Sequence, residues 1–205
     1  MAPRSVVLTR VLLVTAVVVL AAALVWILAD RPAQPDGSPA LAAPPPGGDF
    51  TLIGESGPVA LGDLRGQVAV LYFGYSQCPD VCPVDLAWLG LALRELSPDE
   101  LVQVTGVFVS IDPERDTPER LAEYARYFHP RIIGLTGSDT ELADIATRYG
   151  AAYRRSDSES AMGYMMDHSA SYHLVDRAGR LREILPGGSS AEELSAAIRV
   201  LLSET

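Results

Sequence analysis

Two cysteines carry the clearest chemical signal in this chain of 205 residues. Cys78 and Cys82 are its only cysteines, and both lie in the segment YFGYSQCPDVCPVD, residues 72–85. Thiolates are soft ligands that suit Cu(I), zinc or disulfide chemistry. Because the spacing of the two cysteines does not choose among these, the elements that position them have to be considered.

The cysteines follow a predicted buried strand and lie at the start of a predicted helix. Residues 68–73 (VAVLYF) form a continuous apolar run, which is typical of a central strand covered on both faces. Pro83 is expected to begin the helix, and leucines at helical spacing continue it to about Leu96. The N–H groups and dipole of a helix N-terminus stabilise anions, so the pKa of both thiols should be lowered. That favours metal ligation and disulfide exchange alike.

The rest of the domain alternates strands with helices. Strands are predicted at 50–53, 102–111, 132–135, 164–166, 172–176 and 181–185, and helices at 118–128, 138–149 and 190–202. Residues 97–100 carry a capping box for a short helical turn, and the polar stretch 154–161 is predicted to be a loop. This order predicts an α/β fold with a central mixed sheet flanked by helices. A strand, cysteine turn and helix near the start, with a hairpin and helix at the end, is the plan of a thioredoxin-like domain.

His168 is the candidate for a third metal ligand. Thioredoxins place a cis-proline in the loop that faces their cysteine turn. This sequence has no proline between Met162 and Asp176, and it has His168 where that loop should fall. A neutral imidazole there would complete a Cys₂His site suited to Cu(I) and tolerable for Cu(II). A structural or surface histidine is the alternative.

Other residues of ligand type have ordinary structural explanations. His173 is the rival imidazole, but in a regular strand it would lie on the face opposite to His168. A structural role is also expected for His129 at a helix end, Asp80 at a helix start, Met165 and Met166 in the core, and Asp112, Arg115 and Asp116 in their own turn.

The N-terminal region has the pattern of a membrane anchor. Residues 11–29 form an uncharged, mostly aliphatic run, which as a helix would span about 28 Å. Arg4 and Arg10 precede this run, so the positive-inside rule places the N-terminus in the cytoplasm. The alternative is a cleaved signal peptide, with a small-residue pattern at 40–42.

The predicted organisation therefore has four parts. Residues 1–10 are a cytoplasmic N-terminus, 11–29 a transmembrane anchor, 30–48 a tether rich in Pro, Ala and Gly, and 49–205 a thioredoxin-like copper-binding domain. Cysteines outside the cytoplasm form disulfides by default, but a bridge across four residues closes too small a loop to stabilise a domain much. A net charge of −10 argues against nucleic acid as a partner.

Three motifs in order carry a family resemblance. FGYSQCPDVCP, SIDPERDTPERLAEYA (residues 110–125) and DHS (residues 167–169) resemble the SCO/SenC family of copper chaperones, over about residues 50–202. The resemblance implies a thioredoxin-like domain behind one membrane anchor, with Cys78, Cys82 and His168 as copper ligands. It also implies a role in maturing the dinuclear copper centre of cytochrome c oxidase subunit II. His173 departs from the aromatic or aliphatic residue expected in that strand.

Two functions follow as hypotheses. The first is a copper metallochaperone in the cell (inner) membrane, with its domain on the periplasmic side, that carries Cu(I) or Cu(II) to oxidase subunit II. The second is a thiol–disulfide reductase in which Cys78 and Cys82 are the redox pair that keeps the target's cysteines reduced. Both imply a thiol reductant protein as a further partner. A peroxidase or redox sensor is a weaker hypothesis, because peroxidases of this fold arrange their catalytic residues differently and the sequence shows no such motif.

Overall fold

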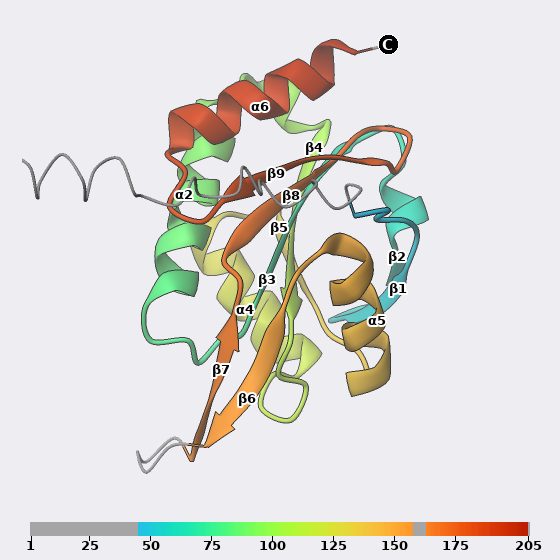
Figure 1. Cartoon of the computed structure of the whole chain (residues 1–205). Helices are drawn as coiled ribbons and strands as arrows, with labels where there is room; N and C mark the ends of the chain where they lie inside the picture. Colours follow the sequence, from blue (N-terminus) through green and yellow to red (C-terminus); the bar gives the residue numbers. More distant parts are fainter. Residues whose placement is uncertain (1–44, 158–162, 205) are drawn as a thin grey trace, which may run out of the picture. The chain divides into compact units, whose positions relative to one another are not determined.

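A five-stranded mixed sheet forms the centre of the structure, a computed structural model that describes residues 45–157 and 163–204 (Figure 1). The strand order is β5-β4-β3-β8-β9. Strands β3, β4 and β5 are parallel, and β8 runs antiparallel to both β3 and β9. Their bounds are Val68–Gly74 (β3), Val104–Ser110 (β4), Ile132–Leu135 (β5), Ser171–Val175 (β8) and Leu181–Pro186 (β9). The predicted central mixed sheet is confirmed.

The two central strands place the functional loops side by side. Every residue of β3 and β4 is buried, as their apolar sequences predict. The strands pair in parallel with Gly74 opposite Ser110, so the loops that follow them leave the same edge of the sheet. One of these loops carries Cys78 and leads to Cys82 in the next helix, and the other is residues 111–117.

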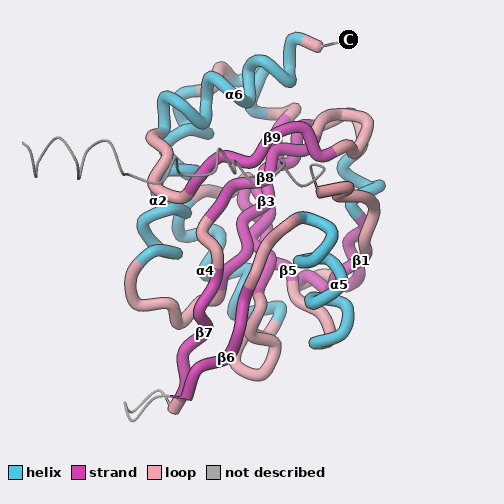
Figure 2. Tube along the Cα trace, viewed as in Figure 1, coloured by secondary structure: helices cyan, strands magenta, loops and turns pink. Residues whose placement is uncertain are grey.

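Helices cover both faces of the sheet (Figure 2). On one face, α2 (Val81–Glu95) packs against α4 (Pro118–Phe128) and α6 (Ala191–Ser203). On the other face lies α5 (Asp139–Tyr149), whose Tyr149 ring contacts Phe73 of β3. The neighbouring Tyr72 points toward α2, because successive side chains of a strand alternate between its faces. The short helix α3 (Pro98–Leu101) begins with the predicted capping box.

Two small ribbons complete the described structure. The strands β1 (Thr51–Gly54) and β2 (Gly57–Ala60) form a hairpin, followed by the 3₁₀ helix η1 (Leu61–Leu64). The strands β6 (Tyr153–Asp157) and β7 (Tyr164–His168) form a second ribbon, which extends from the body of the domain at the end opposite α6 (Figure 1).

Two local predictions are wrong. The segment 154–157, predicted as part of a loop, belongs to strand β6. Its polar side chains give no apolar strand pattern, and it forms a strand because its backbone pairs with β7. The remainder of that predicted loop, at 158–161, lies outside the described residues. Helix α2 begins at Val81, so Pro83 is its third residue, where the missing N–H is still harmless.

Pro45 is the first described residue, and it lies close to the predicted end of the tether. Gly47 donates its N–H to Arg148 O at 2.8 Å, and Gly48 O accepts from the Tyr149 hydroxyl at 3.0 Å. These bonds attach the segment before β1 to the end of α5. The predicted anchor at 11–29 lies outside the described ranges, and within them no helix combines the length and hydropathy needed to cross a bilayer.

Candidate metal centre

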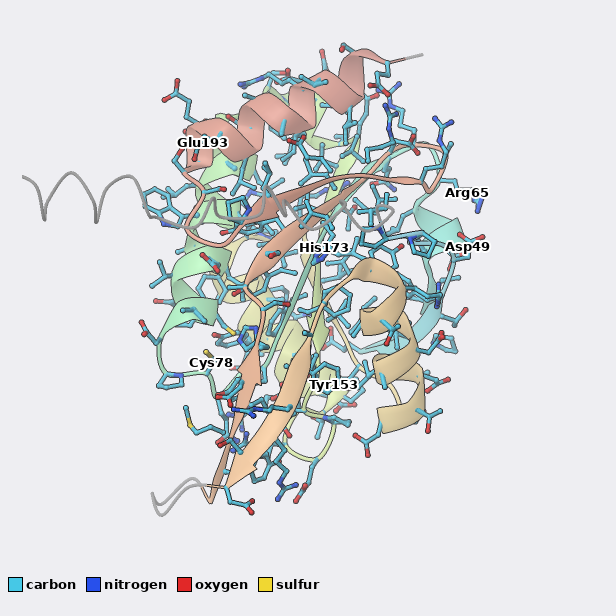
Figure 3. The ribbon with its side chains drawn as sticks, in the orientation of Figure 1. Asp49, Arg65, Cys78, Tyr153, His173 and Glu193 are labelled. Atoms are coloured by element: carbon cyan, nitrogen blue, oxygen red, sulfur yellow. The ribbon has the colours of Figure 1, made fainter. Side chains whose placement is uncertain are left out.

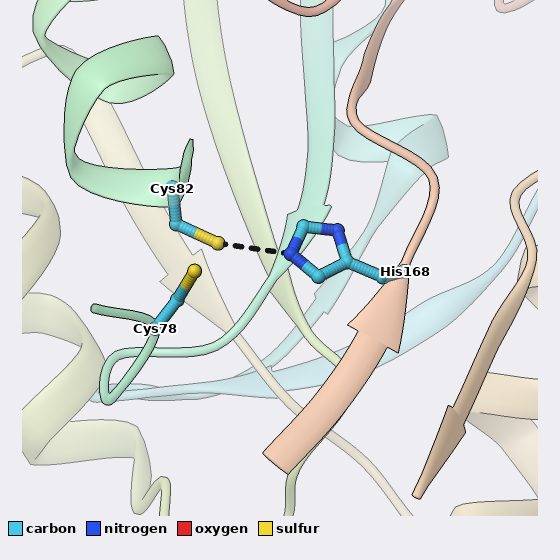
Figure 4. A group of neighbouring side chains, drawn as sticks. All are labelled: Cys78, Cys82 and His168. Atoms are coloured by element: carbon cyan, nitrogen blue, oxygen red, sulfur yellow. Dashed lines mark hydrogen bonds between the residues drawn. The ribbon is translucent and has the colours of Figure 1, made fainter. Parts of the chain in front are cut away.

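The two sulfurs and one imidazole nitrogen converge at the edge of the sheet where β3 ends (Figure 4). The ligand atoms of Cys78, Cys82 and His168 all lie within 4.8 Å of one another. The Sγ atom of Cys82 is 3.2 Å from Nε2 of His168. This is the one such group of three potential metal ligands among the described residues, and it contains the three predicted ones.

The local sequence explains how the cysteines reach this position. The chain turns directly after β3, and the N–H of Cys78 donates to Tyr75 O at 3.2 Å. Cys82 is the second residue of α2 and is fully buried, whereas Cys78 keeps 9% of its surface exposed in the preceding turn. One thiol is therefore at the mouth of the site and the other at its floor. Both cysteines are free thiols in this structure.

The two thiols differ in acidity because they share hydrogen bonds. The pKa of the Cys78 thiol is lowered, chiefly because the Cys82 thiol donates to its sulfur. The backbone N–H groups of Asp80 and Cys82 stabilise the same thiolate. The pKa of Cys82 is raised in turn by its bond to Cys78 and by burial. The sequence-based expectation of a lowered pKa for both thiols therefore holds for Cys78 alone.

His168 lies at the end of β7 with its coordinating nitrogen toward the sulfurs. Its Nδ1 is 3.2 Å from Ser169 O, and a carbonyl can only accept, so this contact keeps the proton on Nδ1. The lone pair of Nε2 then faces Cys82. Ser169 also donates its N–H to Ala152 O at 2.8 Å and accepts from Ala152 N–H through its hydroxyl at 3.0 Å. Ser169 therefore holds the histidine segment against the start of β6.

The donor set and its spacing suit copper. Bonds of about 2.0–2.3 Å to nitrogen and sulfur would place trigonal donors roughly 3.5–4 Å apart, so only small adjustments are needed. Two soft thiolate sulfurs and one imidazole are ligands that bind copper well. The rings of Tyr72 and Tyr75 meet His168 edge-on, at centroid distances of 6.4 and 6.0 Å. They restrict the imidazole to this orientation.

The other residues of ligand type lie outside this group of donors. His173 is buried on the opposite face of the sheet against Phe73 and Tyr149, and it lies apart from Cys78 in Figure 3. Buried His129 accepts the N–H of Arg131 through Nδ1 at 3.0 Å. Met166 packs on the hydrophobic core, as predicted, and exposed Asp80 precedes α2. The sulfur of Met165 lies 4.0 Å from the Tyr75 hydroxyl.

A buried carboxylate that sequence reasoning missed connects both sides of the site. Asp85 is 3% exposed and accepts from the Tyr72 hydroxyl and from Gly188 N–H, each at 2.8 Å. Its backbone carbonyl accepts from the Tyr172 hydroxyl at 2.8 Å. The Asp85 side chain thus links α2 to β3 and to the loop that contains Gly188. In the same loop, Gly187 donates its N–H to the carbonyl of Ala170, two residues after His168. The available signal was an acidic residue one helical turn after Cys82, on the apolar side of the helix.

Gly74 is a second missed residue. A Cβ atom at this position would lie 2.7 Å from the Cys82 sulfur and 3.1 Å from the ring of Phe108. The last residue of β3 therefore has to lack a side chain for the buried sulfur to occupy its place.

The loop at 111–117 reaches further than its own turn. Asp116 accepts the Ser76 N–H at 2.9 Å and the Ser110 hydroxyl at 2.7 Å, so it holds the cysteine turn to the end of β4. Asp112 accepts the Tyr164 hydroxyl at 2.7 Å and thereby holds the start of β7. The expectation that these carboxylates only fix their own turn is incomplete, because their partners come from distant parts of the chain.

The fold and the donor set together define a class: a thioredoxin-like domain with a Cys₂His candidate metal centre at the edge of its sheet. The profile of the SCO1/SenC family matches residues 39–203. The chain belongs to the SCO1/SenC family, as the three sequence motifs predicted.

Named relatives agree with this assignment. The mitochondrial SCO2 homologue of Bos taurus is 36% identical over 154 residues, covering 74% of this chain and 58% of the bovine protein. A SCO2-like protein of Rickettsia prowazekii is 37% identical over 150 residues, covering 72% of this chain and 73% of that protein. The crystal structure of Arabidopsis thaliana ScoI with copper bound matches with a TM-score of 0.70 and 34% identity. That match covers 76% of this chain and 97% of the plant chain. This chain thus spans less than two thirds of the bovine relative's length.

Proposed function

We propose that this protein is a membrane-anchored copper metallochaperone that delivers copper to the dinuclear copper site of cytochrome c oxidase subunit II. The observation that carries the proposal is the convergence of Cys78, Cys82 and His168 within 4.8 Å. A relative with 34% identity has been crystallised with copper bound, which supports copper as the cargo. The family's link to oxidase assembly supports subunit II as the acceptor.

The geometry of the site suits release as well as binding. Three donors leave a copper ion with room for a further ligand, so an acceptor's thiolate or imidazole can bind before a donor of this protein leaves. Cys78 lies at the mouth of the site, where such a ligand would arrive first. Copper passes by ligand exchange and keeps its oxidation state throughout.

Copper affinity of the full-length protein tests the ligand set. We expect the wild type to bind one copper ion, and Cys78→Ser, Cys82→Ser and His168→Ala to lower affinity by at least about 100-fold. Competition titration of Cu(I) against a chromogenic chelator measures this, with Val102→Ser as the control at an exposed site. Wild-type affinity in His168→Ala would exclude the three-ligand site.

A thiol–disulfide reductase is the second candidate, and the lowered pKa of Cys78 favours it. The Cys78 thiolate would attack a target disulfide, and Cys82 would then displace the target as a dithiol. This protein would end with a Cys78–Cys82 disulfide, which a thiol reductant protein must reduce. The His168→Ala variant separates the two candidate functions. If it loses copper binding but still exchanges disulfides, the result supports the reductase. If it loses both copper binding and disulfide exchange, the result does not support the reductase.

The proposed location follows from the N-terminal pattern. Residues 11–29 would anchor the chain in the inner membrane, with residues 1–10 in the cytoplasm and the domain from 49 to 205 on the periplasmic side behind the tether at 30–48. A membrane-impermeant maleimide applied to intact spheroplasts should label Cys78. N-terminal sequencing of the mature protein decides between this anchor and a signal peptide cleaved near 40–42.

A further inference from the structure

The solvent-facing side of α2 is apolar over its first three turns. Val84 is 51% exposed, Leu91 44%, Val81 41% and Trp88 36%, and Ala87 lies exposed between them. The only charged residue of this stretch, Asp85, is buried, and the first exposed charge of the helix is Arg94. We call the five exposed apolar residues the α2 face: Val81, Val84, Ala87, Trp88 and Leu91.

This pattern sets α2 apart from the other long helices. The exposed positions of α4, α5 and α6 include several charged residues, whereas α2 is apolar both toward the sheet and toward solvent. A helix that is apolar on all sides is normally covered. Val81, Val84, Trp88 and Leu91 follow one another at spacings of three, four and three, which suits packing against a helix or ridge.

The α2 face is continuous with the candidate metal centre. Val81 and Val84 lie on either side of Cys82 and Pro83 in the first turn of the helix. A shallow groove lined by Val81, Val84, Ala170 and Gly187 leads from this face to the segment that follows His168. A molecule bound on the face would therefore contact both the cysteine side and the histidine side of the centre.

We infer that the α2 face is the docking surface for the protein that exchanges copper with this centre. The partner would present an apolar helix or ridge beside its own thiolate or imidazole ligands. This inference rests on the proposed chaperone function and adds the surface through which it acts. Five side chains fall well short of the roughly 800 Å² per partner in stable complexes, which suits a transient encounter better than a permanent dimer. A bilayer on this face would cover the groove that leads to the segment after His168.

Copper-transfer kinetics test the inference. The full-length protein in lipid nanodiscs is loaded with Cu(I) and mixed with the apo copper domain of oxidase subunit II. We expect Trp88→Ser and Val84→Ser to lower the second-order transfer rate constant, by about tenfold for Trp88→Ser. Cu(I) affinity and release to a small chelator should stay unchanged. Val102→Ser is the matched control, since Val102 is 66% exposed and precedes β4 at the opposite edge of the sheet.

A photocrosslinker at position 91 identifies the occupant directly. Leu91→p-benzoylphenylalanine should crosslink to the subunit II domain when both proteins are mixed, and a crosslink to lipid, to a second copy or to residues 30–44 instead would overturn the inference.

In the kinetic test, equal transfer rate constants in Val84→Ser and Val102→Ser would overturn the inference as well, while transfer by the wild type would uphold the chaperone function. An absence of transfer from the wild type would overturn the chaperone function, and this inference with it. Should Trp88→Ser fail to fold, Val84→Ser carries the test.

Discussion

At the scale of single residues, the candidate metal centre depends on neighbours as much as on its three donors. Gly74 leaves the space that the Cys82 sulfur occupies, and the Tyr72 and Tyr75 rings confine the imidazole of His168. These contacts are packing constraints, so they can be tested by adding or removing a few atoms without touching a donor.

Gly74→Ala should displace the Cys82 sulfur. The new methyl group would lie 2.7 Å from a sulfur that is fully buried and has little room to move. We expect copper affinity to fall by about 10- to 100-fold, as for other changes next to metal ligands. Competition titration measures the loss. Gly62→Ala is the matched control, because a Cβ there meets no atom within 4 Å. Equal affinities in the two variants would contradict this account.

At the scale of elements, the site is assembled where parallel strands β3 and β4 end together. Loop 111–117 follows β4 and holds the cysteine turn through Asp116, and it holds β7 through Asp112. The helix caps were predictable because their partners are three residues apart, as for Ser138 and Glu141. The partners of Asp116 could not be predicted, because Ser76 comes next to it only when β3 and β4 pair in this register.

Asp116→Asn should loosen the cysteine turn. Oδ2 of Asp116 accepts both the Ser76 N–H and the Ser110 hydroxyl, and Oδ1 accepts the Ser76 hydroxyl, so an amide would place its NH₂ group against at least one of these donors. We expect the free energy of unfolding to fall by about 1–3 kcal/mol. Chemical denaturation measures this change, and copper titration should show weaker binding. Glu119→Gln, an exposed change in the same helix region, should alter neither quantity.

At the scale of the whole molecule, a bound ion would join segments that are 86 residues apart in the chain. The cysteine turn belongs to the body of the domain, whereas His168 ends the β6–β7 ribbon. A ligand that binds only the folded chain stabilises it, so copper should raise the stability of the domain and restrain the ribbon.

Copper should therefore raise the unfolding free energy by about 2.7 kcal/mol when free copper is 100 times the dissociation constant. Thermal unfolding with and without a chelator measures the difference. Amide hydrogen exchange should slow in β7 on metal binding. His168→Ala should show neither effect, and a wild-type response in that variant would exclude copper as the link between ribbon and body.

The stability of the domain should also depend on pH through His173. Burial lowers the pKa of this imidazole to about 4, and its Nδ1 has no hydrogen-bond partner among the described residues. The unfolded chain, with a histidine pKa near 6.5, then binds the proton more readily. The contribution of His173 to the free energy of unfolding is therefore greatest above about pH 6.5. It falls as the pH decreases toward 4, by up to about 3 kcal/mol.

His173→Phe tests this prediction, because it keeps an aromatic ring against Phe73 and Tyr149 and removes the titrating group. Urea unfolding at pH 4.5 and pH 7 should show a smaller difference in the variant than in the wild type. His129, whose pKa is also lowered by burial, is common to both proteins and cancels in the comparison. An unchanged pH difference would assign the acid sensitivity to other groups.

The sequence by itself determined the alternation of strands and helices, the cysteine turn after a buried strand, and the three candidate donor residues. These depend on hydrophobic periodicity, cap motifs and residue type, all of which are local. Only the tertiary structure decided two contacts made by buried carboxylates: that of Asp85 between α2 and β3, and that of Asp116 with the cysteine turn. Strand register sets the Asp116 contact, and the packing of α2 on the sheet sets the Asp85 contact. Both are properties of pairs of segments, so the residues of one segment alone do not reveal them.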